Sequence, residues 1–356
     1  MPDIRPLHRD DLPQVGALIA REYGPVLPAG GEAAWLSDLL CDQPWADPEV
    51  PSLVAAESDG AIIGFMGAHA RRVRLGEREL RAAVCSHLVV DAERRSTAAG
   101  AMLVSRFMSG AQELSYSDTA IEVVARMWRA AGGSIDPVRS LAWVRVLRPG
   151  AWLARVAAGR FGAGDADTGL TPFRPLPIDR GVLRGSVEGL DEVPLTPAVM
   201  MEHADALLSP LTLRLGYTES WLDWLFGRLE HDQRPSRVIS RLVRRRGRPI
   251  GWYVYVRRPS GAGEVLQIAG RPRDIDAVLA SLLAGAKADG VVAMTGRVEP
   301  HLADALRAQK CAVGFGARSV VHTSDRGIRE ALAAPDSLLS RLDGEWWAGA
   351  APAATP

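Results

Sequence analysis

Asparagine is missing from this 356-residue sequence, and only two of its 42 basic residues, Lys287 and Lys310, are lysines. Without asparagine the chain has no acceptor for N-glycosylation. The preference for arginine, together with abundant alanine, glycine and proline, is typical of GC-rich codon usage. It therefore carries no information about chemistry.

Cysteine and long apolar runs are also scarce. Cys41, Cys85 and Cys311 lie far apart and form no Cys-x-x-Cys pair, which favours a reducing compartment and gives no metal signature. The longest apolar run, residues 277–286, is too short to span a bilayer. The first residues are charged and lack the apolar core of a secretory signal. We expect a cytoplasmic protein without a membrane or metal partner.

Net charge is absent as well, because Lys plus Arg and Asp plus Glu each number 42. A balanced chain has no global field to recruit nucleic acid, so no nucleic-acid partner is expected. Hydrophobic residues make up 47% of the chain, enough for sizeable cores, and the length suggests two domains.

The first 150 residues alternate between helical and strand-like patterns. In order, the patterns predict a strand at 3–7, helices at 11–24 and 32–40, strands at 52–57, 61–74 and 80–90, a helix at 96–111, a strand at 114–120, a helix at 121–133 and a strand at 140–149. A turn at Ser58-Asp59-Gly60 should join two of these strands.

The second half repeats this order after a loosely patterned stretch. The sequence DGAIIGFMG at 59–67 is echoed by RGRPIGWYV at 246–254, which suggests two like domains. We predict an α+β, three-layer fold with two domains, each a mixed, mostly antiparallel sheet flanked by helices. The predicted parts are a first domain (1–150), a connecting arm (151–195), a second domain (196–330), and a C-terminal amphipathic helix with a tail (331–356).

One strand-to-helix turn carries a possible binding site. Residues 87–103 read HLVVDAERRSTAAGAML, in which two arginines and a run of small residues stand where a helix begins. A helix N-terminus presents unpaired N–H groups and partial positive charge, and small residues let phosphate oxygens approach the backbone. An ordinary capped helix with solvated arginines would explain the pattern equally well.

The element order around this turn resembles the GNAT superfamily, the GCN5-related acyl-CoA-dependent N-acyltransferases. The family signature is a strand ending Val-x-Pro, then Arg/Gln-x-x-Gly-x-Gly/Ala opening a helix. Here it is matched without a gap by Val90-Asp91-Ala92, by the run from Arg95 to Gly100, and by Leu103. Ala92 replaces the proline, and Ala98 replaces the first motif glycine, although alanine tolerates a positive φ poorly.

The resemblance implies acetyl-CoA or another acyl-CoA as co-substrate. The strand backbone would pair with the pantetheine amides, and the N–H groups of the turn would hold the pyrophosphate. The implied cofactor-binding residues are Leu88, Val89, Val90, Arg95, Ser96, Thr97, Ala98, Ala99, Gly100 and Ala101. The corresponding turn of the second half, GRPRDIDAV at 270–278, has a proline and two aspartates in place of small residues, so we expect that half to have lost CoA binding.

Direct transfer to an amine needs a base for the amine and an acid for the thiolate. Many relatives use a helix tyrosine, but this register places Trp128 there. We name Tyr116 and His87 as catalytic candidates; a packed strand tyrosine and a satisfied core histidine are the competing interpretations. Further candidates near the site are His69, Ser86, Asp118 and Glu122. Asp118 is equally well explained as a helix N-cap, and Cys85 as a buried, inert thiol.

The leading hypothesis is an N-acyltransferase that uses acetyl-CoA or another acyl-CoA and acylates an amine of a small molecule or peptide directly. The alternative is a non-catalytic acyl-CoA-binding or scaffold protein, favoured by the altered turn and the missing helix tyrosine. The sequence leaves the acceptor, the acyl length and the existence of a homodimer open.

Overall fold

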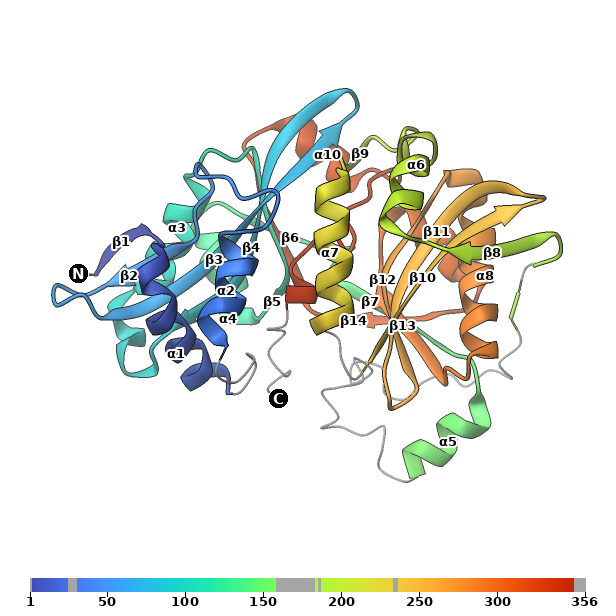
Figure 1. Cartoon of the computed structure of the whole chain (residues 1–356), viewed down its shortest axis with the longest axis horizontal. Helices are drawn as coiled ribbons and strands as arrows, with labels where there is room; N and C mark the ends of the chain where they lie inside the picture. Colours follow the sequence, from blue (N-terminus) through green and yellow to red (C-terminus); the bar gives the residue numbers. More distant parts are fainter. Residues whose placement is uncertain (1, 25–30, 158–182, 185–186, 233–235, 349–356) are drawn as a thin grey trace. The chain divides into compact units, whose positions relative to one another are not determined.

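The structure is a computed structural model in which residues 2–24, 31–157, 183–184, 187–232 and 236–348 are described (Figure 1). The chain divides into two compact units. The first comprises Met1–Asp136, Arg318–Arg329 and Asp343–Pro352, and the second comprises Pro137–Ala317, Glu330–Leu342 and Ala353–Pro356. Each unit contains one sheet flanked by helices, which confirms the predicted fold class.

The first unit holds a mixed sheet. Its strands are β1 (Asp3–Pro6), β2 (Leu53–Ala56), β3 (Ile62–Leu75), β4 (Arg78–Val90), β5 (Leu114–Ala120), β6 (Ser134–Asp136) and β15 (Arg318–His322). Along the sheet they run β1-β2-β3-β4-β5-β15-β6. Every neighbouring pair in this path is antiparallel except β4 with β5. The turn between β2 and β3 forms at Gly60, whose φ of 86° suits glycine.

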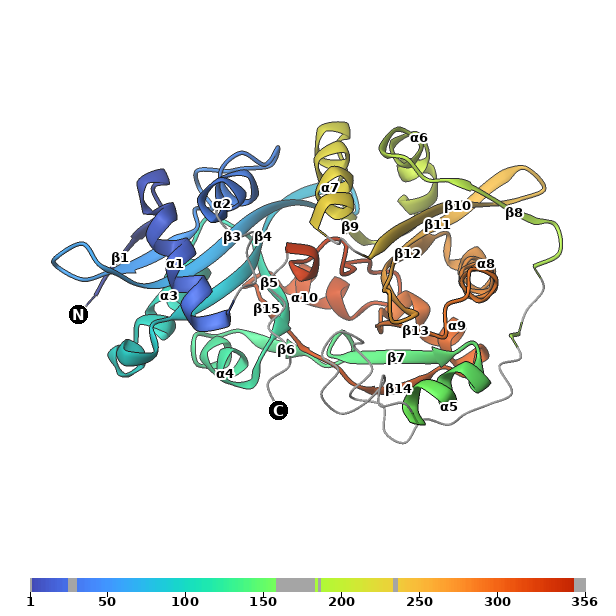
Figure 2. The same cartoon turned by 60° about the horizontal axis from the view of Figure 1, so that its bottom comes forward.

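Helices cover both faces of this sheet, as Figure 2 shows, with α1 and α2 on one side and α3 and α4 on the other. The helical segments are η1 (Arg9–Asp11), α1 (Leu12–Tyr23), α2 (Glu32–Leu40), η2 (Ala92–Thr97), α3 (Ala99–Met108) and α4 (Glu122–Ala130). The α3 and α4 side carries the apolar core, where Leu103, Phe107 and Trp128 pack on alternate residues of β3 and β4 such as Ala83 and Cys85. The opposite face of these strands carries the buried polar side chains of His69, Arg71 and Ser86 beside apolar ones such as Phe65 and Val84.

The second unit repeats the plan. Its strands are β7 (Leu141–Val146), β8 (Leu190–Pro194), β9 (Leu213–Leu215), β10 (Arg237–Arg245), β11 (Arg248–Arg257), β12 (Ala262–Gly270), β13 (Ala293–Arg297) and β14 (Ala312–Phe315). The sheet order is β14-β7-β13-β12-β11-β10-β8, and only β12 with β13 is parallel.

The helices of the second unit again lie on both sides of its sheet. They are α5 (Pro149–Ala157), α6 (Pro197–Leu208), α7 (Glu219–Asp232), η4 (Pro272–Asp274), α8 (Ile275–Ala288), η5 (Pro300–Leu302) and α9 (Ala303–Ala308). The apolar side chains of α8, among them Val278, Leu279 and Leu282, form the largest part of the core with β11 and β12.

Two strands differ in position from the prediction. The strand expected at 140–149 to close the first domain exists as β7, but it pairs with β13 and β14 in the second sheet. The final strand of the second half, β15, pairs with β5 and β6 in the first sheet. An alternating apolar pattern identifies a strand but does not identify its partner, so this exchange is invisible in the sequence.

The predicted C-terminal amphipathic helix is wrong in position. The helix there is α10 (Arg326–Ala333), and residues 336–345 are not helical; η6 (Trp346–Ala348) follows them. The hydroxyl of Ser337 bonds the carbonyl oxygens of Leu332 and Ala334, and serine side chains that bond nearby backbone in this way compete with helix formation. Of the predicted connecting arm, 158–182 lies outside the described residues.

Candidate active site at the bulge of strand β4

Strand β4 leaves its parallel neighbour part of the way along its length. It pairs with β3 from Arg78 to Val90, but its ladder with β5 contains three pairs, which end at Val84 with Tyr116. Within the described residues, β4 beyond Val84 has no ladder with β5. Main-chain groups on that edge of β4 are therefore not paired with β5.

A bulge lies in the same stretch. Phe65 of β3 stands opposite Val89 and Gly67 stands opposite Ser86, so β4 has one more residue than β3 between these pairs. His87 takes up the extra length with a φ of 51°, a conformation that is strained for a residue other than glycine. Strain of this kind concentrates at functional sites because the surrounding structure must hold it in place.

The main chain of Leu88, the first predicted pantetheine contact, is already bonded to a side chain. The carbonyl oxygen of Leu88 accepts a hydrogen bond from the hydroxyl of Tyr23 at 2.6 Å. A carbonyl oxygen has two lone pairs, so this bond leaves one for a ligand amide. Val89 and Val90 continue the strand opposite β3, as predicted.

Two histidines flank one serine hydroxyl beside the bulge. Nδ1 of His87 lies 2.8 Å from Oγ of Ser86, and Nε2 of His69 lies 2.7 Å from the same oxygen. Burial lowers the pKa of His87 to about 4, so its imidazole is neutral at pH 7. Its Nε2 is buried without a hydrogen-bond partner among the described residues. A neutral imidazole with a free ring nitrogen can accept a proton.

Tyr116 is in a different situation. Its side chain is buried, and its hydroxyl donates a hydrogen bond to the main-chain oxygen of Asp343 at 2.8 Å. Burial raises the pKa of this phenol further above its usual range. The structure thus links Tyr116 to the C-terminal segment and His87 to Ser86.

The predicted phosphate turn has the geometry that its motif requires. The 3₁₀ turn η2 runs into Ala98, whose φ is 59° and ψ is 9°, and α3 begins at the next residue. The first motif glycine is therefore replaced by alanine at a left-handed position, and the alanine keeps the conformation. A left-handed L-residue costs roughly 1–2 kcal/mol.

Charged side chains around the turn are paired within the chain. Arg95 binds Oε2 of Glu22 at 2.8 Å, and Oε1 of the same glutamate accepts a hydrogen bond from the main-chain N–H of Ala92 at 3.1 Å. Arg94 lies 3.4 Å from Glu57. Of Ser96 and Thr97 only the backbone is described.

Gly100 has a packing role in the turn. A Cβ there would lie 3.4 Å from both Met127 and Val90, so the residue faces α4 and β4. The side chain of Ala99 is buried in the same core, whereas Ala101 is exposed. Small residues are therefore needed here for helix packing as well as for any ligand.

At the corresponding turn of the second unit, the carboxylate of Asp274 lies where the first unit has small residues. Asp274, buried at the N-terminus of α8, binds Arg245 at 2.7 Å and Arg273 at 3.5 Å. The residue that follows it, Ile275, has an ordinary right-handed conformation. An anionic ligand would meet a fixed negative charge at this turn.

Two functional candidates were missed from the sequence. Arg71 of β3 and Glu345 near the C-terminus are buried on the polar face of the first sheet, where Arg71 donates to the main-chain oxygen of Asp343 and Glu345 binds the main chain of Asp118. Neither belongs to a motif, and a buried charged residue is recognisable only once its burial is known. Asp118 itself lies in β5, three residues before the N-cap Ile121 of α4, so it is not the predicted helix cap.

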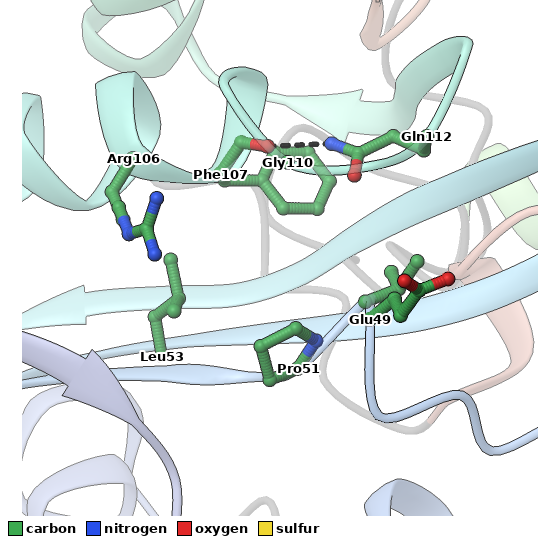
Figure 3. Close-up of a pocket in the computed structure, with 8 residues that line it drawn as sticks. Glu49, Pro51, Leu53, Arg106, Phe107, Gly110 and Gln112 are labelled. Carbon is green, nitrogen blue, oxygen red and sulfur yellow. Dashed lines mark hydrogen bonds between the residues drawn. The ribbon is translucent and has the colours of Figure 1, made fainter.

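Elsewhere in the first unit, Figure 3 shows a shallow cavity of about 60 Å³ between the start of β2 and the end of α3. It is lined by residues such as Pro51, Leu53 and Phe107. Among the described residues, no three His, Cys, Asp or Glu side chains gather in a way that could hold a metal ion. In the same part of the chain, no helix is both long and apolar enough to cross a bilayer.

No protein-family model matches the sequence, and no curated protein matches it. Solved structures do match. A conserved protein of Enterococcus faecalis V583, described as a probable N-acyltransferase, has a TM-score of 0.61 at 11% identity over 91% of this chain and 73% of that chain. A GCN5-related N-acetyltransferase from Kribbella flavida has a TM-score of 0.56 at 13% identity, with 91% and 72% covered.

A third match is the N-myristoyltransferase of Saccharomyces cerevisiae with bound myristoyl-CoA, at a TM-score of 0.50 and 10% identity, with 95% of this chain and 84% of that chain covered. At such identities a likeness shows the fold alone. This chain therefore has the fold of the GCN5-related N-acetyltransferases, consistent with the tandem arrangement predicted from its sequence.

Proposed function

We propose that the chain is an acyl-CoA-dependent N-acyltransferase whose first unit carries the active site. The observation that supports this most directly is the continuity of β4: one strand leaves its parallel neighbour, bulges at His87 and runs into the left-handed turn at Ala98. A thioester arm, a proton acceptor and a diphosphate-binding turn would thus be held by a single stretch of backbone.

The cofactor-binding residues remain those of the motif. The main chain of Leu88 to Val90 would pair with the pantetheine arm, and the N–H groups from Arg95 to Ala101 would hold the diphosphate of acetyl-CoA or another acyl-CoA. The proposal is supported by the left-handed conformation of Ala98 and by the short side chains of residues 98–101, which would let phosphate oxygens approach the backbone. The ion pair between Arg95 and Glu22 reduces the positive charge offered to the ligand.

For proton transfer, His87 is the better supported of the two catalytic candidates. Its Nε2 would accept the proton that the attacking amine releases, while Ser86 holds Nδ1 and fixes the ring. The hydroxyl of Tyr116 already donates a hydrogen bond to the main-chain oxygen of Asp343, so Tyr116 would act as an acid only after that hydrogen bond is broken. The acyl acceptor in this proposal is an amine of a small molecule or peptide. We further propose that the protein is cytoplasmic and works without a metal ion.

Equilibrium dialysis with labelled CoA and acetyl-CoA tests the binding step. Saturable binding to the full chain supports the proposal, and the absence of binding removes it. Release of CoA thiol in the presence of a panel of amines then tests turnover.

The alternative, a non-catalytic acyl-CoA-binding or scaffold protein, is favoured by the engaged Arg95 and by the bonded hydroxyl of Tyr116. Saturable binding without thiol release from any acyl-CoA across the amine panel would support that alternative.

A further inference from the structure

A segment from the end of the chain is fixed on the polar face of the first unit. The main-chain oxygen of Asp343 accepts hydrogen bonds from Tyr116 Oη at 2.8 Å and from Nε of Arg71 at 3.1 Å. Nη2 of Arg71 reaches the carbonyl oxygen of Gly344 at 3.4 Å. The guanidinium also lies 5.7 Å from the ring centroid of Trp347, which is itself buried. These contacts hold residues 343–347 against β3 and β5.

The side chain of Glu345 fills a bulge in β5. Ala120 stands opposite Arg318 and Ser117 stands opposite Val320, so Asp118 and Thr119 together face a single residue of β15. Oε1 of Glu345 accepts hydrogen bonds from both of their main-chain N–H groups, at 2.9 and 3.0 Å. It also accepts from the hydroxyls of Ser117 at 2.6 Å and Thr119 at 2.9 Å.

The second oxygen of Glu345 lies beside Asp118. Oε2 accepts a hydrogen bond from the main-chain N–H of Asp118 at 3.0 Å, and Oδ1 of Asp118 accepts one from the main-chain N–H of Glu345 at 3.2 Å. Both residues are buried, with 6% of Glu345 and 2% of Asp118 exposed. Two buried carboxyl groups held this close together are favoured when one of them holds a proton. Since Oε1 already accepts four hydrogen bonds, that proton belongs on the Oε2 side, between Glu345 and Asp118.

Electrostatics favour the protonated form of the docked segment. Burial, followed by the negative charge of Asp118, raises the pKa of Glu345 well above its usual range. Several titratable or charged groups face Glu345 from the neighbouring elements and its own segment: Asp118 and Tyr116 of β5, Arg71 of β3, Cys85 of β4 and Asp343. Arg71 provides the positive charge in this set, so ionising Glu345 would add a buried charge beside Asp118.

The backbone also permits no side chain at the neighbouring position. A Cβ on Gly344 would lie 2.5 Å from an oxygen of Asp118. The segment can therefore approach β5 this closely only because residue 344 is glycine.

We propose that residues 343–347 form a plug on β5, seated by a proton that Glu345 shares with Asp118, and that loss of this proton releases the plug. Residues 117–119 lie beyond the last β4–β5 pair, where β4 leaves β5 and continues into the stretch to which the proposed function assigns the thioester arm. The regulatory part of this inference, that release opens the acyl site, therefore rests on that proposed function. The plug itself does not.

The direction of the pH effect follows from the raised pKa of Glu345. The docked state binds the proton more tightly than the released state, so docking is most favourable at low pH and is lost as the pH rises through the docked-state pKa. Each released segment gives up one proton. Between the ordinary pKa of a glutamate and the raised docked-state pKa the docking equilibrium falls about tenfold per pH unit, and above the docked-state pKa it is constant.

Amide hydrogen exchange tests the release. In the full chain, protection of peptides covering 114–120 and 343–348, corrected for the intrinsic exchange rate, should fall about tenfold per pH unit once the pH exceeds the ordinary pKa of a glutamate, and should level off above the docked-state pKa. Glu345→Gln should remove this dependence, because an amide presents an acceptor at Oε1 and a permanent donor to Asp118. Asp118→Asn should shift release to higher pH, and Gly344→Ala should expose both peptides at every pH.

Glu264→Gln is the matched control in the second unit, because Glu264 is buried but paired with Arg258 at 3.2 Å and with Arg341 at 2.5 Å. It should leave the pH dependence of the plug unchanged. Equal pH profiles for the wild type and Glu345→Gln, with both variants folded, would overturn the proposal. CoA binding measured in parallel separates the two claims: release without any CoA binding keeps the plug and removes the proposed function.

Discussion

The two halves of this chain share a plan and differ in where they tolerate strain. In the first unit, β4 and the turn after it hold two residues other than glycine at positive φ, His87 and Ala98. In the second unit, β12 and its turn hold none, and Asp274 neutralises the arginines beside the helix N-terminus. The shared plan thus keeps the packing similar in both halves, while strained residues occur on the strand and turn before the central helix in the first unit and not at the equivalent place in the second.

One histidine from each unit can be compared. Nε2 of His301 in the second unit lies 2.9 Å from the main-chain oxygen of Ile268, and Nδ1 of His87 lies 2.8 Å from the side-chain oxygen of Ser86. In each ring the other nitrogen is buried without a partner among the described residues. Burial lowers the pKa of both. His301 contacts a main-chain oxygen and has no positive φ, which makes it the control for His87.

The largest expected effect is on turnover. His87→Asn should lower kcat by about 10²–10⁴, the usual contribution of a general base, and asparagine tolerates the left-handed backbone at this position. His301→Asn should leave kcat within about twofold, because that residue bonds only the main chain. Thiol-release kinetics on the two purified variants measure the difference. Equal losses in both would place His87 among the structural residues.

Stability should also depend on pH through His87. Between the ordinary value of 6.5 and the lowered pKa of about 4, the unfolded chain binds a proton there that the folded chain does not. The free energy of unfolding should therefore fall as the pH drops through this window, by about 3 kcal/mol in total.

Urea unfolding at pH 7, 5.5 and 4.5 measures this dependence in the wild type and in His87→Asn. The wild type should lose more stability than the variant on acidification. Parallel losses in the two proteins would mean that the imidazole is solvated in the folded chain.

Placing a negative charge at each of the two turns should change CoA affinity at only one of them. Ala98→Glu places a carboxylate at the exposed left-handed residue and should weaken CoA binding about 100-fold, the product of like-charge repulsion and a blocked approach to the N–H groups. Arg273→Glu makes a similar change at the second turn, where the side chain is 77% exposed, and should leave CoA affinity unchanged. Dialysis of both variants decides whether one turn or both bind the cofactor.

The sequence predicts the local parts of this fold better than its long-range pairings. The turn at Gly60, the helix after the phosphate turn and the strand around Tyr116 depend on neighbouring residues and are confirmed as elements. The exchange of β7 and β15 depends on partners more than 100 residues away, for which an alternating pattern gives no information.

The same division holds within the site. The left-handed turn follows from a motif, because the first motif glycine marks a positive φ, and Ala98 occupies that position. Glu345 follows from no motif, and its role depends on the bulge in β5 and on the proton shared with Asp118. Residues that act through burial can be identified only after the chain is folded.

The smallest expected effect is on the free energy of unfolding and tests the backbone strain at Ala98. Ala98→Gly should raise the free energy of unfolding by about 1 kcal/mol, because glycine removes most of the left-handed cost of roughly 1–2 kcal/mol and loses part of the gain as backbone entropy in the unfolded chain. Lys310→Gly is the matched variant, since Lys310 has a φ of 53° in the second unit, and it should stabilise the chain by a similar amount.

Only the change at Ala98 should affect the ligand. Removing the methyl group lets phosphate oxygens approach the turn more closely, so CoA affinity should rise severalfold in Ala98→Gly and stay constant in Lys310→Gly. Chemical unfolding and dialysis on the same two proteins separate the contributions. Stabilisation of both variants with no change in affinity would show that the left-handed residue serves the fold of the turn and not its ligand.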